Sequence, residues 1–326
     1  MLPDFAYVRP TTVADASSAL AAGAARALAG GTDLVGCLRD RVFDAASVVS
    51  LGALADLKGV AELADGALRI GALTTIAAIA ADATIRVRYP ALAEAARSVA
   101  SPQLRSQGTI GGNLCQKPRC WYYRGDFDCL RKGGPMCYAV GGENEYHAVF
   151  GGGPCVYVHP SDTAPALVAL GASVRIAAAR GARTVPLEEF HVRPEVDVTR
   201  ETVLEAGEIV TDVLLPAPAP GQRSTYRKVR ARQAWDFALV GAAIGLRLTG
   251  DRVSEARVVL SGVAPVPWRA REAETALNGR RLDRTTIARA AAAAAAGADP
   301  LEKNGYKVPL ITGLVEERLT ALITPA

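Results

Sequence analysis

The chain has 326 residues, of which 50% are hydrophobic and 21% are charged, and its formal net charge at pH 7 is +4. This length predicts about two domains, and the composition is that of a globular protein with ample material for a core. The small net charge argues against a nucleic acid or an anionic membrane as partner. No apolar run reaches the ~20 residues that span a bilayer, and the first residues predict no signal peptide.

The first part of the chain, residues 1–55, predicts a small unit of strands and helices around a glycine-rich turn. We expect a helix over 12–22 and strands over 27–29 and 47–51. Gly30-Gly31-Thr32-Asp33 follows the first strand, where glycines let the backbone approach a ligand and present N–H groups to an anion.

A second segment with the same chemistry, Gly108-Thr109-Ile110-Gly111-Gly112-Asn113, follows a strand at 68–71 and helical stretches at 75–81 and 85–100. A single Gly-Gly pair is usually a tight turn, but two such loops could clamp the two phosphates of a dinucleotide. Neither segment is the G-x-G-x-x-G of a Rossmann unit, and the chain has no P-loop motif. A nicotinamide-type Rossmann enzyme and a P-loop NTPase are therefore disfavoured.

Cysteines concentrate in an aromatic and glycine-rich segment, for which we expect a long irregular loop. Five of the six cysteines lie between residues 115 and 155, and only Cys37 lies elsewhere. Loops of this length inside a domain are usually functional. A chain of this size does not need disulfides for a core, so local clustering points to metal binding or redox chemistry.

The remainder predicts a helix at 162–170, strands at 173–177 and 209–215, and a proline-rich linker at 216–222. Prolines at alternate positions cannot occupy a helix interior or a central strand. We therefore divide the chain into 1–55, 56–215 with an insertion at 117–155, the linker, and an α+β domain at 223–326. In this last domain we expect strands at 224–230, 243–248 and 253–262, and helices at 267–277, 284–296 and 310–322.

Four motifs in this order carry a family resemblance: residues 29–34, Thr109-Ile-Gly-Gly-Asn-Leu-Cys-Gln116, Pro160-Ser161-Asp162 and Tyr226-x-Lys228-x-x-x-Arg232. The set resembles the FAD-binding medium subunit of the xanthine dehydrogenase family of molybdenum hydroxylases. The resemblance implies an α+β protein. Its two-part FAD-binding domain would be like that of vanillyl-alcohol oxidase (PCMH-type), followed by a small C-terminal domain as in carbon monoxide dehydrogenase flavoprotein.

The resemblance also implies a set of FAD-binding residues. The first glycine segment would wrap the pyrophosphate and the second would close over it. Asp162 would hydrogen-bond the adenosine half, and Lys228 would reach the flavin ring. Without the family, Asp162 would be read as a helix N-cap and Lys228 as a solvated strand residue. The full set is Arg26, Ala27, Leu28, Ala29, Gly30, Gly31, Thr32, Asp33, Leu34, Thr109, Gly112, Asn113, Asp162, Ile209, Val210 and Lys228.

The insertion resembles that of a subgroup which includes bacterial periplasmic aldehyde oxidoreductase and 4-hydroxybenzoyl-CoA reductase. In that subgroup the insertion carries a [4Fe–4S] cluster, here on Cys120, Cys129, Cys137 and Cys155. Cluster ligation needs four thiolates that converge from a flexible loop. A Cys₄ zinc site is the rival reading, although the chain lacks a C-x₂-C knuckle, and disulfides come last. His147 is a possible substitute ligand.

The function that the resemblance implies is that of an electron-transfer subunit in a heterotrimeric molybdenum hydroxylase acting on aldehydes. A small partner with two [2Fe–2S] clusters would pass electrons to FAD, and a large partner with the molybdenum cofactor would oxidise the substrate. FAD would pass the electrons on to an external acceptor, and we assign no catalytic residue to this chain. Two alternatives are a self-sufficient FAD oxidase or dehydrogenase and a zinc-stabilised nucleotide-binding module. We expect a cytoplasmic protein, or a periplasmic one if it is exported with a signal-bearing partner.

Overall fold

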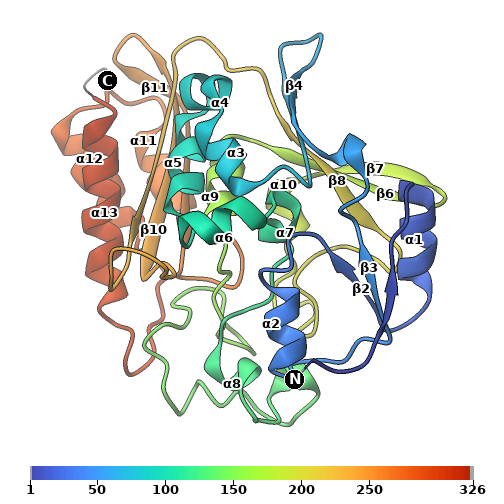
Figure 1. Ribbon diagram of the computed structural model, residues 1–326. Helices are drawn as coiled ribbons and strands as arrows, with labels where there is room; N and C mark the ends of the chain where they lie inside the picture. Colours follow the sequence, from blue (N-terminus) through green and yellow to red (C-terminus); the bar gives the residue numbers. More distant parts are fainter. Residues whose placement is uncertain (1, 324–326) are drawn as a thin grey trace.

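The computed structural model describes residues 2–323, whose strands form three sheets (Figure 1). The first sheet is parallel, in the order β1 (Ala6–Val8), β3 (Ser47–Ser50), β2 (Ala25–Leu28). Helix α1 (Val13–Ala21) begins where the sequence predicts, because the Thr12 side chain caps it by accepting a hydrogen bond from the Asp15 amide (3.1 Å). Helix α2 (Leu34–Arg39) follows the first glycine segment.

The second sheet is antiparallel, and its strands come from two distant parts of the chain. The order is β4 (Val60–Glu62), β5 (Leu68–Gly71), β8 (Ile209–Leu215), β6 (Ser173–Ala178), β7 (Gly181–Pro186). The strands predicted at 68–71 and 209–215 are confirmed, and β8 lies between β5 and β6 at the centre of the sheet. A short 3₁₀ turn, η1 (Ala55–Leu57), leads into β4.

A group of helices packs beside this sheet and fills the main core: α3 (Ile76–Ala81), α4 (Ala83–Arg88), α5 (Pro90–Ser98) and α9 (Thr163–Ala169). The single helical stretch expected over 85–100 is wrong. The chain leaves the helical conformation at Tyr89, and Pro90 starts a new helix at the position where a missing N–H costs nothing. The short helices α6 (Pro102–Gln107), α7 (Ile110–Leu114) and α10 (Leu187–Phe190) complete this part.

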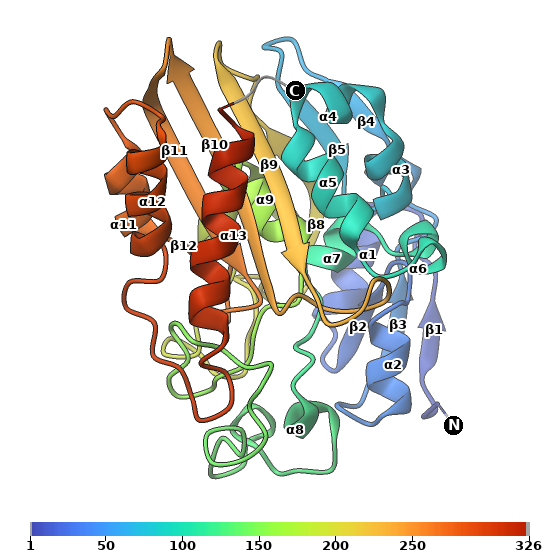
Figure 2. The ribbon, with the colours of Figure 1, turned by 90° about the vertical axis from the view of Figure 1, so that its left-hand side faces the viewer.

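The third sheet is antiparallel, in the order β12 (Trp268–Arg269), β11 (Arg252–Ser261), β10 (Val240–Thr249), β9 (Gln222–Val229). Helices α11 (Arg271–Leu277), α12 (Arg284–Ala293) and α13 (Lys307–Ala321) cover one face, and α5 and α9 lie on the other (Figure 2). The helix expected from residue 267 starts later, because Trp268 and Arg269 pair with β11 instead.

The two faces of strand β10 pack against different groups of helices. Val240, Ala242, Ile244 and Leu246 belong to the core beneath α11–α13. The opposite face carries small residues, and a Cβ atom at Gly245 would lie 2.6 Å from the carbonyl oxygen of Ala169 in α9. Because side chains alternate between the two faces of a strand, β10 presents larger apolar residues to the three helices and small residues to α9, which can therefore pack closely.

The cysteine-rich segment, residues 117–155, is largely irregular, as expected, and lies at one end of the molecule below the sheets (Figures 1 and 2). It contains only the short helix α8 (Trp121–Arg124) and a 3₁₀ turn, η2 (Leu130–Lys132). Partners outside it satisfy its backbone: Lys307 donates to the His147 carbonyl oxygen (2.8 Å) and Asn304 to that of Ala148 (3.1 Å). Within residues 2–323, no helix has the length and apolar character to cross a membrane.

We expect the substitution Leu92→Ala in α5 to lower the free energy of unfolding by about 2–5 kcal/mol. Leu92 is fully buried in the main core, so truncation leaves a cavity there. The matched control is Val87→Ala in the neighbouring helix, where the side chain is 80% exposed and the change should stay within about 0.5 kcal/mol. Denaturant unfolding followed by circular dichroism measures both, and equal losses would contradict this account of the core.

Candidate functional site: a two-lobed cavity at the glycine segments

The two glycine-rich segments lie backbone against backbone. A Cβ atom at Gly30 would overlap the carbonyl oxygen of Gln107, just before the second segment, so only glycine fits. Gly31 has φ +73°, a left-handed conformation that other residues adopt only with strain. The first segment is thus held in one conformation by contact with the second.

The second segment is a helix start, not the predicted loop. Thr109 accepts a hydrogen bond from the Gly112 amide through its side chain (3.2 Å), and α7 begins at Ile110. An N-cap threonine followed by two glycines reads as a turn in sequence, but the cap organises the glycines into a helical turn. A Cβ atom at Gly111 would lie 2.9 Å from the Cβ of Ala72, so this turn also packs closely against the residue that follows β5.

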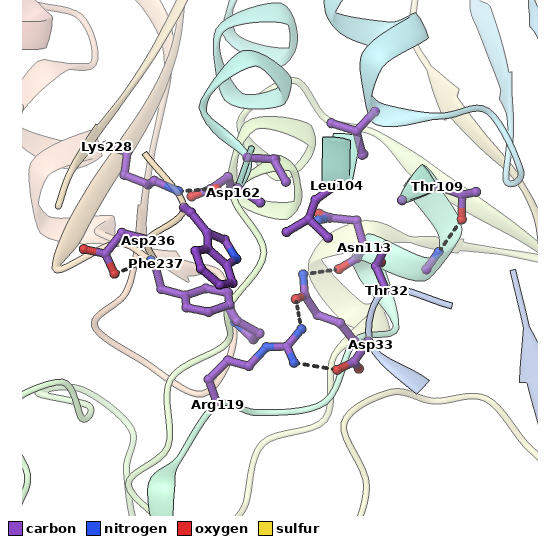
Figure 3. A pocket seen from close by; sticks show the side chains of 18 residues that line it. Thr32, Asp33, Leu104, Thr109, Asn113, Arg119, Asp162, Lys228, Asp236 and Phe237 are labelled. Carbon is purple, nitrogen blue, oxygen red and sulfur yellow. Dashed lines mark hydrogen bonds and ion pairs between the residues drawn. The ribbon is translucent and has the colours of Figure 1, made fainter. Parts of the chain in front are cut away.

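Two cavities meet at these segments and form one two-lobed site. Both lobes share a neck lined by Thr32, Asp33, Thr109, Gly112 and Gln116. We call the lobe that contains Asp162 and Lys228 the polar lobe (Figure 3), and the one that contains Ile209 and Val210 the apolar lobe. A neck of glycine and threonine between two ring-sized spaces suits a dinucleotide, with its phosphates at the neck and one ring system in each lobe.

A buried ion pair lines the polar lobe. Lys228 Nζ lies 2.7 Å from Asp162 Oδ2, and only 2% and 6% of the two side chains are exposed. The Tyr226 hydroxyl donates to the other carboxylate oxygen (2.8 Å). Burial raises the pKa of Asp162 above its ordinary value, and the Lys228 ammonium offsets this only in part. Lys228 is therefore not the solvated strand residue that its position alone suggests.

The interpretation of Asp162 as a side-chain N-cap is wrong. Its side chain does not cap α9, since Ser161 accepts the hydrogen bond from the Ala164 amide instead (2.9 Å). Asp162 and Lys228 also lie together, whereas the resemblance assigned one to the adenosine half and the other to the flavin.

Asn113 joins the second glycine segment to α9. Its amide oxygen accepts hydrogen bonds from the hydroxyls of Ser161 (2.5 Å) and Thr163 (2.6 Å). These bonds fix α7 relative to the start of α9 and thereby hold Asp162 at the cavity wall.

The apolar lobe collects most of the remaining predicted residues. Ile209 and Val210, at the start of β8, are buried along its wall. Leu28 is the exception among the predicted residues: it lines neither lobe and packs with Leu38 and Val48 on the other side of the first sheet. The predicted residues that do line this lobe or the neck are Arg26, Ala27, Ala29, Gly30, Gly31, Thr32, Asp33, Leu34, Thr109 and Gly112.

Sequence reasoning missed several residues of the site. Leu104, Trp235 and Phe237 line the polar lobe from segments that carry no motif. Gln116 lines both lobes, and Arg119 reaches the polar lobe from the cysteine-rich segment. The only sequence signal for these was the position of Gln116 at the end of the second motif.

The four cysteines of the 117–155 segment are free thiols, and Cys120 and Cys129 share one apolar cluster. Interaction with the neighbouring Cys155 thiol lowers the pKa of Cys137, and interaction with Cys137 together with burial raises the pKa of Cys155. His147 Nε2 lies 3.3 Å from the Cys120 sulfur. Among residues 2–323, however, no three His, Cys, Asp or Glu side chains converge closely enough to hold a metal ion. The described residues therefore contain free thiols in this segment without a formed metal site.

Comparison with known proteins gives matches along almost the whole chain. Residues 3–218 match the family described as "FAD binding domain in molybdopterin dehydrogenase", and residues 224–320 match "CO dehydrogenase flavoprotein C-terminal domain". These two matches and the structural neighbours confirm the predicted fold class.

Among the relatives, the aldehyde oxidoreductase FAD-binding subunit PaoB of Escherichia coli K12 is 36% identical over 84% of this chain and 86% of its own length. The carbon monoxide dehydrogenase medium chain of Hydrogenophaga pseudoflava is 28% identical over 98% and 97%. Among solved structures, carbon monoxide dehydrogenase from H. pseudoflava superposes with a TM-score of 0.79 at 28% identity, covering 99% of this chain and 98% of that one. Quinoline 2-oxidoreductase of Pseudomonas putida 86 gives a TM-score of 0.77 at 26% identity, with coverages of 99% and 98%.

We expect Lys228→Met to lower the free energy of unfolding by about 3–5 kcal/mol, because it leaves the buried Asp162 carboxylate without a counter-charge. Since burial raises the pKa of this carboxyl, the loss should shrink as the pH falls and Asp162 takes up a proton in the folded state. Denaturant unfolding across pH measures both effects.

The double substitution Asp162→Asn with Lys228→Met should recover part of that stability. As a matched control, Arg39→Met removes a cation from the exposed Arg39–Asp40 pair and should leave the free energy of unfolding almost unchanged. A loss for Lys228→Met no larger than that of the control, at every pH, would show that the pair is not the buried interaction described here.

Proposed function

The chain belongs to the FAD-binding medium subunits of the xanthine dehydrogenase and carbon monoxide dehydrogenase family, and on this premise we propose that it carries electrons through a bound FAD. The protein is thereby a subunit of an oxidoreductase. In the proposal, FAD takes electrons from the [2Fe–2S] clusters of a partner and delivers them to an external acceptor. The observation that supports it best is the two-lobed cavity with its neck of glycine and threonine.

The residues around the cavity suggest how FAD would lie. The neck would hold the pyrophosphate on the backbone N–H groups of the glycine segments and the Thr32 hydroxyl. The carboxylate of Asp162 suits ribose hydroxyls, so the polar lobe would take the adenosine half. The isoalloxazine ring would then occupy the apolar lobe against Ile209 and Val210. When bound, FAD would supply a group that accepts electrons singly or in pairs.

This arrangement changes the role of Lys228. Because its ammonium is paired with Asp162 at 2.7 Å, it would lie with the adenosine half rather than at the flavin ring. Its role would be to keep the buried carboxylate ionised, so that Asp162 accepts hydrogen bonds from the ligand. The cations of the lobe proposed for the flavin would then be Arg26 and Lys117, which line it together with Ile209 and Val210.

We also propose the partners implied by the resemblance: a small subunit with two [2Fe–2S] clusters and a large subunit with the molybdenum cofactor. The names of the relatives support this, since they include a FAD-binding subunit and medium chains of larger enzymes. Among the substrates of these relatives, an aldehyde is the one we propose, on the 36% identity to an aldehyde oxidoreductase subunit. Substrate oxidation would take place on the large partner, and no residue of this chain is assigned to it.

For the cysteine-rich segment we propose a [4Fe–4S] cluster on Cys120, Cys129, Cys137 and Cys155. The support is chemical: four free thiols share one segment, Cys137 and Cys155 interact, and the Cys120 sulfur lies 3.3 Å from His147 Nε2. The described side chains do not form a set of metal ligands, so we derive no electron-transfer step through the cluster. Zinc on the same thiols is the competing outcome.

The purified full chain should contain about one FAD, and Gly31→Ala should weaken FAD binding by at least tenfold. The reason is that Gly31 has φ +73° at the neck, where a Cβ would also lie 3.3 Å from Leu28 and Val35 side-chain atoms. The matched control is Gly279→Ala, at φ +74° in a distant turn with nothing near its Cβ, which should lose stability but not FAD affinity. Quenching of flavin fluorescence measures the affinity. Absence of flavin from well-folded wild-type protein would overturn the proposed function.

Chemical analysis of the same sample tests the metal. We expect about four irons and four sulfides per chain after anaerobic purification, and their loss in Cys137→Ser but not in Cys37→Ser. Cys37 is buried in the same apolar cluster as Cys129 but is not one of the four proposed ligands, so it serves as the control for a change of thiol at this place. Zinc without iron would leave the flavoprotein assignment intact and reject the cluster.

A further inference from the structure

The carboxylate of Asp33, at the end of the first glycine segment, is directed toward the cysteine-rich segment. Its Oδ1 accepts hydrogen bonds from the guanidiniums of Arg119 (2.6 Å) and Arg124 (2.8 Å). Its Oδ2 accepts one from the backbone amide of Lys117 (2.7 Å). Asp33 stands at the N-cap position of α2, yet its side chain makes no capping bond there. Both oxygens therefore accept hydrogen bonds from residues 117–124, and Oδ1 also accepts a longer one from the Cys37 thiol (3.7 Å).

These donors close residues 117–124 into a compact turn. Arg124 also donates to the carbonyl oxygens of Pro118 (2.8 Å) and Lys117 (3.3 Å), and Arg119 donates to the side chain of Gln116 (3.1 Å). Arg124 is 16% exposed and Asp33 18%, so these charge-assisted bonds are largely shielded from water. Burial acts to raise the pKa of Asp33, but the two guanidiniums outweigh it and hold the pKa below its usual value.

The same turn forms part of the cavity wall. Gln116 lines both lobes, Lys117 lines the apolar lobe, and Arg119 lines the polar lobe, where Figure 3 shows it directed at Asp33. Asp33 itself directly follows Thr32 in the neck. A single carboxylate therefore sets the position of the neck and of the first part of the cysteine-rich segment at once. Arg124 completes this arrangement but lines neither lobe.

We propose that Asp33 couples the FAD site to the cysteine-rich segment, so that ligand binding at the neck and closure of residues 117–124 stabilise each other, with Arg124 as a positioning residue. This inference rests on the proposed binding of FAD. Coupling between two sites is reciprocal in free energy: whatever strengthens FAD binding when the segment is closed must favour the closed segment when FAD binds. Closure of the segment would then slow the release of the cofactor, whether or not the segment holds a metal.

The test compares Arg124→Met with Lys132→Met in the full chain. Lys132 is a cation of the same segment that donates to the Gly125 carbonyl oxygen (2.8 Å), lines neither lobe and makes no contact with Asp33. We expect Arg124→Met to weaken FAD binding at least ~5-fold, the lower end of ordinary coupling, and Lys132→Met to leave the affinity unchanged. Arg124→Lys, which keeps the charge but not the paired geometry, should fall in between.

The opposite direction of the coupling, from FAD binding to closure of the segment, is tested on the wild-type chain alone. Chymotrypsin should cleave at Trp121 or Phe127, which are 49% and 42% exposed, and added FAD should slow this cleavage at least ~5-fold. Cleavage at Trp235, on the rim of the polar lobe, is not used as a reporter because the ligand itself would cover it.

Each outcome decides one point. A wild-type chain that binds no FAD refutes the proposed function and leaves coupling without a ligand. A wild-type chain that binds FAD, with equal affinity in Arg124→Met and no protection of residues 117–155, overturns the inference while the proposed function stands. Should Arg124→Met fail to fold, protection of the wild-type segment by FAD and the affinity of Arg124→Lys still decide.

Discussion

The structure depends on the close approach of two backbone segments, Gly30 and the carbonyl of Gln107. The first belongs to the small parallel sheet and the second to the helices beside the antiparallel sheet. These two units share no strand, so their relative position is set where they touch. A side chain at residue 30 would separate them and widen the neck between the lobes. This contact defines the narrow part of the cavity, and it positions the two units together with the apolar cluster that joins Val49 and Leu51 to Leu73 and Ile209.

The C-terminal domain completes the site from the other side. Tyr226 and Lys228 lie on β9 of the third sheet, yet both bond the carboxylate of Asp162 at the start of α9. Small residues on one face of β10 bring α9 close enough for these bonds to form. Buried ion pairs contribute little net stability, but they penalise any arrangement in which one partner is left alone. The pair thus favours a single docking geometry of the third sheet on α9.

Particular elements show how much of the structure can be predicted from the sequence. The strands at 68–71 and 209–215 follow from their apolar patterns and bounding turns, and the Thr12 cap identifies the start of α1. Pro90 signals a helix start, but an alanine-rich stretch on both sides conceals the break. Four of the five neck residues follow from glycine chemistry and the family resemblance, and Gln116 does not. The partners of Asp33, Asp162 and Lys228 do not, because they join segments more than 60 residues apart, and a single sequence carries no record of such contacts.

The cysteine-rich segment shows why irregular structure need not be loose. Its fold is held from outside: Arg131 donates to the Val198 carbonyl oxygen (2.6 Å), Lys307 to those of His147 and Gly262, and Asp33 receives the donors of residues 117–124. Lys307 is fully buried between two carbonyl oxygens, and this burial lowers its pKa to about 7. A segment whose backbone groups are satisfied by both neighbouring domains does not require a metal to define its path. Any metal that binds the thiols would therefore bind a loop whose two ends are already fixed. Its free energy of binding would restrict the positions of the thiols rather than create the fold.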